Sequence, residues 1–313
     1  MRAPALNQHP ARERALGLFA VVIAAISWGF TGILVDKAAS GPITLTFYRM
    51  WVAAALIFAA SVFARRRPTW NAIRIAAPAG VFLCVDITLT FYAFRFTSVA
   101  VASIIGALTP ALVLLLSRRV LGERASWQDA LLVAVATAGV AIVVVGPAGP
   151  RGNHLSGDIY ALLGTLAFVG YWLSAKRVRN SVDGLQYTSA VWLVAAVVIT
   201  PATLIAGAPL RLMAPSDWIW ISLLVLVPGG GHVLVMWAHK AVKATVSAMI
   251  SQGNILVAAV AANIFLRQQM TWSEVGGGLL AVMATSAIAV REARRAPSPE
   301  AVETVAEAGL PAG

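Results

Sequence analysis

Residues 43–95 read ITLTFYRMWVAAALIFAASVF, then ARRRPTWNA, then IRIAAPAGVFLCVDITLTFYAFR. Two apolar stretches of about 20 residues therefore flank a short basic segment. At a rise of about 1.5 Å per residue, a helix of this length crosses the hydrocarbon core of a bilayer, which is about 30 Å thick. This stretch predicts two membrane-spanning helices joined by a basic turn.

The same alternation of apolar and polar segments continues along the chain. Of its 313 residues, 59% are hydrophobic and 12% are charged, whereas soluble domains carry about 25% charged residues. A soluble core could not bury so much apolar surface, because single cores stop growing beyond about 250–300 residues. The sequence therefore predicts an all-α integral membrane protein with ten transmembrane helices, at residues 15–35, 43–63, 73–95, 98–117, 127–146, 158–175, 186–206, 217–238, 244–265 and 272–291.

The net charge of +11 does not indicate a nucleic-acid partner. The Lys and Arg residues occur in short clusters between apolar stretches, whereas a basic binding face would be continuous. Most of the 24 basic residues fall in segments on one side of the membrane. The positive-inside rule then predicts that both termini are cytoplasmic, and we expect a multi-pass protein of the cell inner (plasma) membrane. The single cysteine, Cys84, excludes an intrachain disulfide.

The two halves of the chain resemble each other weakly. VLGERASWQDALL, from residue 120, aligns with FLRQQMTWSEVGG, from residue 265, and this pairs Trp127 with Trp272 and Asp129 with Glu274. A unit of five spans is odd in number, so its second copy must insert upside down, as in many secondary transporters. We expect two inverted five-helix repeats, although a ten-helix protein without repeats is the alternative. The predicted organisation is a first repeat at 1–146, a loop at 147–157, a second repeat at 158–291 and a disordered cytoplasmic tail at 292–313.

Several motifs resemble a known family. ISWGFTGILVDKAASGPITLTFYRMWVAA, residues 26–54, contains a Trp-Gly pair beginning at Trp28, a proline at Pro42 and an arginine at Arg49. It resembles the first two helices of the EamA-type, ten-helix transporters of the drug/metabolite transporter superfamily. The resemblance implies a metabolite transporter, often an exporter. It also implies a central cavity lined by helices 1–4 and 6–9, with helices 5 and 10 at the periphery.

The resemblance extends over residues 15–291 but weakens in the second half. Pro110 and Glu123 match the family's helix 3–4–5 junction, whereas Ile255 and Gln268 stand where the family pattern has a proline and an acidic residue. This departure leaves the substrate unassigned.

Arg49 and Asp86 are the ionisable residues deepest in the predicted spans. On insertion scales each costs about 2.5–3.5 kcal/mol at a helix centre, so each should face a partner or a water-filled cavity. Thr90 lies on the same helix face as Asp86, because four residues separate them. Two interpretations stay open: an ion pair that fixes helices 2 and 3, or a carboxylate at Asp86 that binds a cationic substrate group or a proton.

The motif VPGGG, residues 227–231, precedes His232 in the eighth predicted span. We expect Pro228 and the three glycines to weaken or break this helix, and broken helices at the membrane midplane expose backbone groups that coordinate a ligand or an ion. The alternative is a kink with His232 hydrogen-bonded to a neighbour, which a lone histidine favours over a proton relay.

Aromatic and polar side chains supply the other candidates for substrate binding. Stacked rings hold planar or cationic groups, although rings near span ends also form interfacial belts, and polar side chains also join helices to one another. The predicted substrate-binding set is Asp86, Arg49, Trp28, Tyr48, Tyr92, Thr109, Tyr171, Trp172, His232, Trp237, Ser251, Gln252 and Asn254.

Signatures of enzymes are absent from the sequence. It contains no HExxH zinc motif, no GxSxG nucleophile elbow and no GxxxxGK[ST] phosphate loop, so we expect no catalysis, no cofactor and no metal. The predicted function is a secondary transporter, an exporter of small metabolites such as amino acids or related amines, that alternates access around a midplane cavity. An importer or facilitator for another class, such as a nucleotide-sugar-like carrier, is the alternative; a non-transporting scaffold or enzyme is a more distant one. The expected partners are a small-molecule substrate and the lipid bilayer; proton coupling and the oligomeric state stay open.

Overall fold

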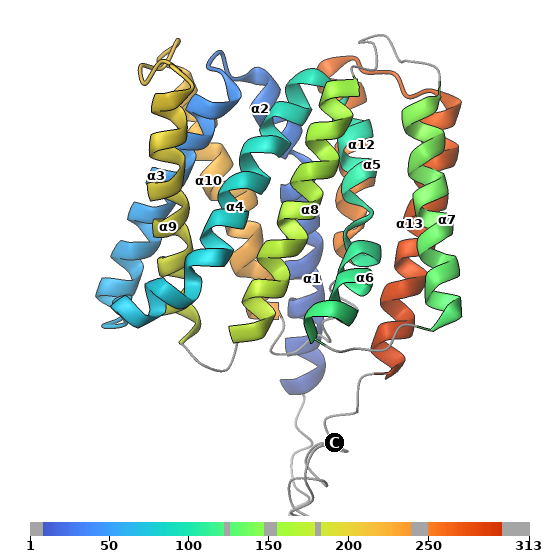
Figure 1. The fold of residues 1–313 in the computed structure, drawn as a ribbon, viewed down its shortest axis with the longest axis horizontal. Coiled ribbons are helices and arrows are strands. Elements are labelled where there is room, and N and C mark those ends of the chain that lie inside the picture. The colour runs from blue at the N-terminus through green and yellow to red at the C-terminus, as the bar shows by residue number, and fades with distance from the viewer. Residues whose placement is uncertain (1–8, 122–125, 147–154, 179–182, 239–249, 296–313) are drawn as a thin grey trace, which may run out of the picture.

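The computed structural model describes residues 9–121, 126–146, 155–178, 183–238 and 250–295. Every regular element in these residues is an α-helix, and the helices stand side by side in one bundle (Figure 1). Their bounds are α1 His9–Gly29, α2 Thr31–Lys37, α3 Pro42–Phe63, α4 Trp70–Phe96, α5 Val99–Gly106, α6 Thr109–Leu121, α7 Trp127–Val145, α8 Leu155–Val178, α9 Gly184–Ile205, α10 Asp217–Ala238, α12 Gly253–Leu266 and α13 Trp272–Arg295.

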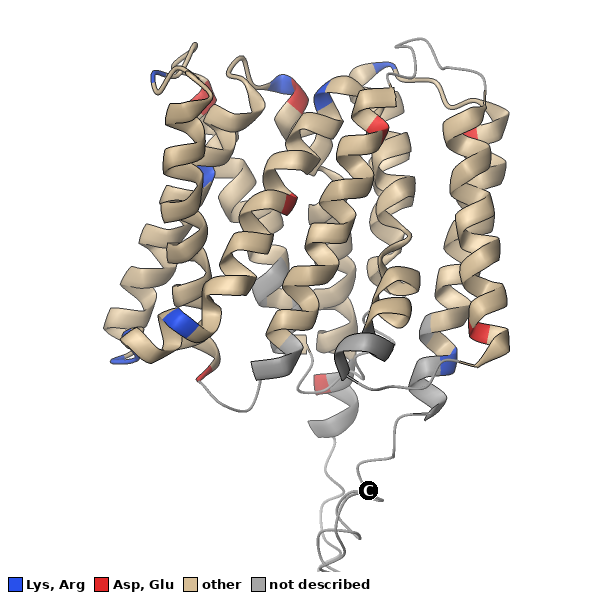
Figure 2. Cartoon of the chain, viewed as in Figure 1, with Lys and Arg blue, Asp and Glu red and all other residues tan. Residues whose placement is uncertain are grey.

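The bundle has the surface of a membrane protein. In the described residues, seven helical segments are long and apolar enough to cross a membrane, and α10 and α12 hold shorter apolar stretches. Large apolar side chains point outward, including Phe63 at 88% exposure and Trp272 at 91%. Most of the charged residues lie toward the two ends of the bundle, with few between them (Figure 2). Apolar sides between charged ends fit a bilayer, so the predicted multi-pass membrane protein is confirmed.

Three of the predicted spans are interrupted in the structure. Phe30 separates α1 from α2, and Ala107 with Leu108 separates α5 from α6. A turn at Gln252 precedes α12. At the first interruption, a Cβ on Gly29 would lie 2.6 Å from Val257 Cβ, so α1 ends where it crosses α12 at close range. Hydropathy reports whether a segment suits lipid and not whether its helix is continuous, which is why the sequence predicted single helices here.

The expected break in the eighth span is wrong. α10 runs without interruption through Pro228 and the three glycines that follow it. Gly231 instead permits a close helix crossing, because a Cβ there would lie 2.9 Å from Trp28 Nε1. The indole of Trp28 also donates a hydrogen bond to the carbonyl of Pro228 at 3.0 Å. Packing against α1 therefore holds this part of α10 in helical form.

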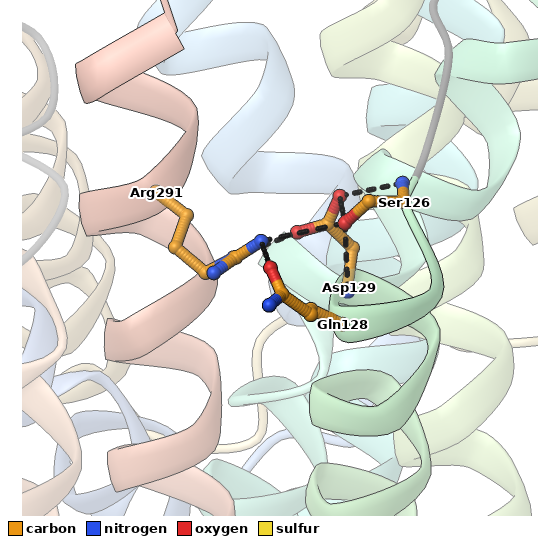
Figure 3. Close-up of polar contacts among 4 residues, drawn as sticks. All are labelled: Ser126, Gln128, Asp129 and Arg291. Atoms are coloured by element: carbon orange, nitrogen blue, oxygen red, sulfur yellow. Dashed lines mark hydrogen bonds and ion pairs between the residues drawn. The ribbon is translucent and has the colours of Figure 1, made fainter.

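α7 and α13 form a pair at one side of the bundle (Figure 1). Their backbones are in contact, since a Cβ on Gly277 would lie 2.4 Å from the carbonyl oxygen of Gly139. At one end of the pair, Arg291 Nε lies 3.0 Å from Asp129 Oδ1, and the guanidinium also reaches Ser126 and Gln128 (Figure 3). The peripheral position expected for the fifth and tenth spans agrees with this pair.

α4 is packed along α8 and α9, which belong to the other half of the chain. Three glycines of α8 allow the close contact with α4. A Cβ on Gly157 would collide with Thr97, one on Gly164 would touch Thr90, and one on Gly170 would collide with Phe82. This packing carries the middle of α4, including Asp86, into the interior of the bundle.

Candidate functional site

The carboxylate of Asp86 lies near the middle of α4. It is half-buried, and Thr90 Oγ1, one turn later, donates a hydrogen bond to Asp86 Oδ1 at 3.2 Å. Gly164 of α8 lies opposite, where a Cβ would be 3.0 Å from Thr90 Oγ1. The predicted shared face of Asp86 and Thr90 is therefore present and is turned toward the second half of the chain.

The guanidinium of Arg49 lies inside the bundle on α3 with 5% of the residue exposed. Its Cζ is placed over the ring of Phe91, 5.2 Å from the centroid, which is a cation–π contact. Within the described residues it forms neither a hydrogen bond nor an ion pair. A buried guanidinium normally has several hydrogen-bond acceptors, so Arg49 holds unused donors.

Arg49 and Asp86 lie near enough to act on each other electrostatically. No ion pair joins them, however, among the residues that the structure describes. The structural ion pair that the sequence left open is not formed in this conformation. Two opposite charges are thus held inside the bundle without touching, and this leaves both available to a third group.

Two tyrosines extend this site toward α8 and α9. Tyr171 of α8 is half-buried and interacts electrostatically with Asp86. Tyr187 of α9 lies close to Tyr171, and its buried hydroxyl has no hydrogen-bond partner in the described part of the chain. The sequence-based set includes Tyr171 but not Tyr187, because a tyrosine near a span end is also typical of an interfacial belt. It also missed Phe91, whose position under Arg49 depends on how α3 and α4 are rotated.

The other predicted aromatic residues are distributed over several places. Tyr48 donates to the carbonyl of Leu210 and its ring lies 5.1 Å from that of Trp218, so it connects α3 to the start of α10 and the segment before it. Tyr92 packs against Tyr160, with 5.5 Å between ring centroids. Trp28 is hydrogen-bonded to α10, as described above, and Trp172 is 45% exposed. The structure does not gather these rings into a single aromatic cluster.

The polar candidates of the fourth and ninth spans lie at helix interruptions. Thr109 begins α6, and its hydroxyl donates to the carbonyl of Gly106 at 2.8 Å. Ser251, Gln252 and Asn254 are half-buried around the turn before α12, and their side chains make no hydrogen bond to the described residues. His232 and Trp237 belong to α10, but their side chains lie outside the described part of the structure.

The described residues contain no group of three or more His, Cys, Asp or Glu side chains that could hold a metal ion. Arg49, Asp86 and the neighbouring rings can recognise a ligand by charge, hydrogen bonds and aromatic faces. Arg49 offers donors in a planar fork suited to a carboxylate, and Asp86 offers acceptors for an ammonium group.

Comparison with known proteins gives a consistent result. The EamA-like transporter family matches the chain twice, over residues 15–145 and residues 155–290. Solute carrier family 35 member G1 of Mus musculus is 28% identical over 226 residues, which cover 68% of this chain and 60% of that protein. One solved crystal structure, 20% identical, has a TM-score of 0.60 and is matched over 91% of this chain and 99% of its own. At that identity the likeness shows a shared fold.

Proposed function

Because the chain belongs to the EamA-like transporter family, we propose that it is a secondary transporter of small metabolites whose substrate binds between Arg49 and Asp86. The observation that carries this proposal is the pair of opposite charges inside the bundle. Arg49 is buried with its donors unused, and Asp86 is close but not in contact. Buried charges are costly unless they are paired, so a function that needs them separate explains their arrangement.

The substrate class follows from the two charges. A guanidinium binds a carboxylate through two parallel hydrogen bonds, and a carboxylate binds an ammonium group. A small molecule that carries both groups satisfies both side chains at once, and this describes an amino acid or a related metabolite that has both a carboxylate and an ammonium group. The rings of Phe91 and Tyr171 border the two charges and are suited to the apolar part of such a substrate.

Alternating access between two inverted five-helix repeats is the transport mechanism that we infer. Three observations support it. Ser126 with Asp129 and Thr271 with Glu274 form the same capping arrangement at the starts of α7 and α13. The interruptions at Ala107 and Gln252 occupy matching positions in the aligned halves. The contacts between helices also fit a two-fold relation, in which α4 corresponds to α10 and α8 corresponds to α1. α4 packs on α8, and α10 packs on α1.

Export from a cytoplasm-facing site is the direction that we propose, and the charge bias supports the orientation. The end of the bundle that holds the loop at residues 64–69 is basic, with Arg65, Arg66 and Arg67 in one turn. Under the positive-inside rule this end faces the cytoplasm. We call it the inner end, and the opposite end, with the loop at residues 38–41, the outer end.

A flux assay in proteoliposomes tests the proposal. The purified chain is reconstituted and offered labelled amino acids, their decarboxylated amines, dicarboxylates and nucleotide sugars, with and without a pH gradient. We expect flux of one or more amino acids, reduced at least about tenfold in both Arg49→Gln and Asp86→Asn, which corresponds to the loss of about 1.4 kcal/mol of binding at each charge.

Matched variants separate site effects from general damage. Arg211→Gln and Glu13→Gln remove charges of the same signs at exposed positions outside α3 and α4 and should retain flux. Loss of flux in Arg49→Gln alone, with dicarboxylates or nucleotide sugars transported, would identify an anion carrier instead. Unchanged amino-acid flux in both site variants would refute the proposed binding site.

A further inference from the structure

A second buried polar site lies at the outer end, where α8 begins. α4 ends at Phe96, residues 97–98 form a short extended link, and α5 starts at Val99. α8 lies directly on this link, because a Cβ on Gly157 would be 2.6 Å from both Phe96 C and Thr97 N. The next residue, Asp158, is thereby carried into the protein with 5% exposure.

Two buried oxygen atoms at this contact have no hydrogen-bond partner among the described residues. Asp158 Oδ1 and Thr97 Oγ1 are both buried and form no hydrogen bond within the described residues. The Thr97 hydroxyl adjoins the Asp158 side chain, but the two are not joined by a hydrogen bond of acceptable geometry. A buried polar atom left without a partner costs about 1–3 kcal/mol, and a buried charge costs more. A third group in contact with both atoms would remove this cost.

The neighbouring backbone does not supply this group. The first amides of α5 are already used, because Val101 N donates to Ser98 Oγ and Val99 N donates to Gln268 Oε1, each at 3.1 Å. No Lys or Arg forms an ion pair with Asp158 among the described residues. The last carbonyl groups of α4 also point to this end, and a helix C-terminus carries a partial negative charge. The site therefore presents several oxygen atoms around one carboxylate.

We propose that Asp158 and Thr97 bind a sodium ion at the end of α4. Carboxylate, hydroxyl and carbonyl oxygens are the ligands preferred by hard cations, and ends of interrupted helices coordinate Na⁺ in secondary transporters of other folds. A single carboxylate matches one positive charge, and the described residues offer no acidic cluster for a divalent ion. A water molecule would satisfy the two oxygens but would add no positive charge beyond the partial one at the start of α8, in whose first turn Asp158 lies.

This site is separate from the proposed substrate site. Thr97 follows Asp86 by about three turns of α4, a rise of about 16 Å. Sodium binding can therefore be measured on the purified protein without any substrate, and its outcome does not depend on the flux assay.

The experiment compares thermal unfolding of the purified, detergent-solubilised chain in sodium chloride, potassium chloride and choline chloride at equal ionic strength. A ligand that binds only the folded state raises the unfolding midpoint with its concentration. We expect Na⁺ to raise the midpoint saturably by at least about 2 °C over choline. Asp158→Asn and Thr97→Val should each remove most of this response.

The control is Asp217→Asn, which alters another buried carboxylate at the outer end, one that already accepts hydrogen bonds from Ala39, Ser40 and the Ser40 hydroxyl. It should lower stability and keep the sodium response. Equal midpoints of the unmodified chain in the three salts would refute the site, and that comparison needs no variant to fold. A further outcome is that low pH, in place of sodium, raises the unfolding midpoint, and that this increase is lost in Asp158→Asn. The site would then bind a proton, which contradicts the proposal.

Discussion

Arg49 is a charged residue in an interior that favours apolar side chains. The bundle places a guanidinium against the face of Phe91 and gives it no acceptor in the described part of the chain. A cation over an aromatic face that is shielded from water gains about 2 kcal/mol or more, which offsets part of the desolvation. The ring thus positions the guanidinium without using its hydrogen-bond donors.

Substitution of Phe91 tests this role. Phe91→Leu should keep the fold, lower the free energy of unfolding by about 1–3 kcal/mol and raise the apparent KM for the transported substrate severalfold. Denaturant unfolding and flux measurements check the two effects. Phe94→Leu, at another buried ring of α4, should cost similar stability and leave KM unchanged. Equal KM values in the two variants would mean that the ring of Phe91 does not position Arg49.

At the scale of the helices, the sequence predicted where spans lie much better than how they are built. Length and hydropathy were sufficient to find the spans because lipid imposes both. The interruption at Phe30 and the continuity of α10 through Pro228 depend on contacts between α1, α10 and α12, which no single segment encodes. For the same reason the interior position of Asp86 and Arg49 could be predicted from their cost in lipid, whereas the positions of the aromatic residues relative to one another could not.

The close contact between α7 and α13 provides a test at this scale. Gly277→Ala places a methyl group 2.4 Å from a backbone carbonyl of α7, so the helices must separate, and we expect a loss of about 1–3 kcal/mol in the free energy of unfolding. Gly276→Ala is the matched control, because it points into open space on the same helix. It should be neutral or stabilising by up to about 1 kcal/mol. If the two variants unfold at the same denaturant concentration, the contact between α7 and α13 is not close-packed.

The matching helix starts allow a second test. Ser126→Ala and Thr271→Ala each remove one side chain of the capping arrangements at α7 and α13, and each should cost about 1 kcal/mol. The two sites lie at opposite ends of the helix pair, so the double variant should lose the sum of both values. Denaturant unfolding of the three variants measures this. A large difference between the single variants would contradict an equivalent role for the two caps.

For the whole molecule, the two halves are joined at both ends. At the outer end, Asp217 of α10 accepts hydrogen bonds from Ala39 N at 2.8 Å and Ser40 N at 2.9 Å. At the inner end, Arg66 forms an ion pair with Asp183, and Gln186 donates to the carbonyl of Arg67. Under the proposed alternating access, one of these connections opens while the other holds, so their relative strengths should set which side of the site is exposed.

Weakening the outer connection should therefore expose the site to the outside. Asp217→Asn leaves one oxygen where two accept at present, and each hydrogen bond to a charged group contributes about 1.5–3 kcal/mol. We expect a membrane-impermeant thiol reagent added outside to label Thr90→Cys about tenfold faster in the Asp217→Asn background, since 1.4 kcal/mol corresponds to a factor of ten. Cys84, the single native cysteine, is replaced by serine in all variants.

Asp183→Asn weakens the inner connection instead and should slow external labelling. Identical labelling rates in the two backgrounds would show that these end connections do not control access, and the alternation would then have to arise within the helix packing around α4.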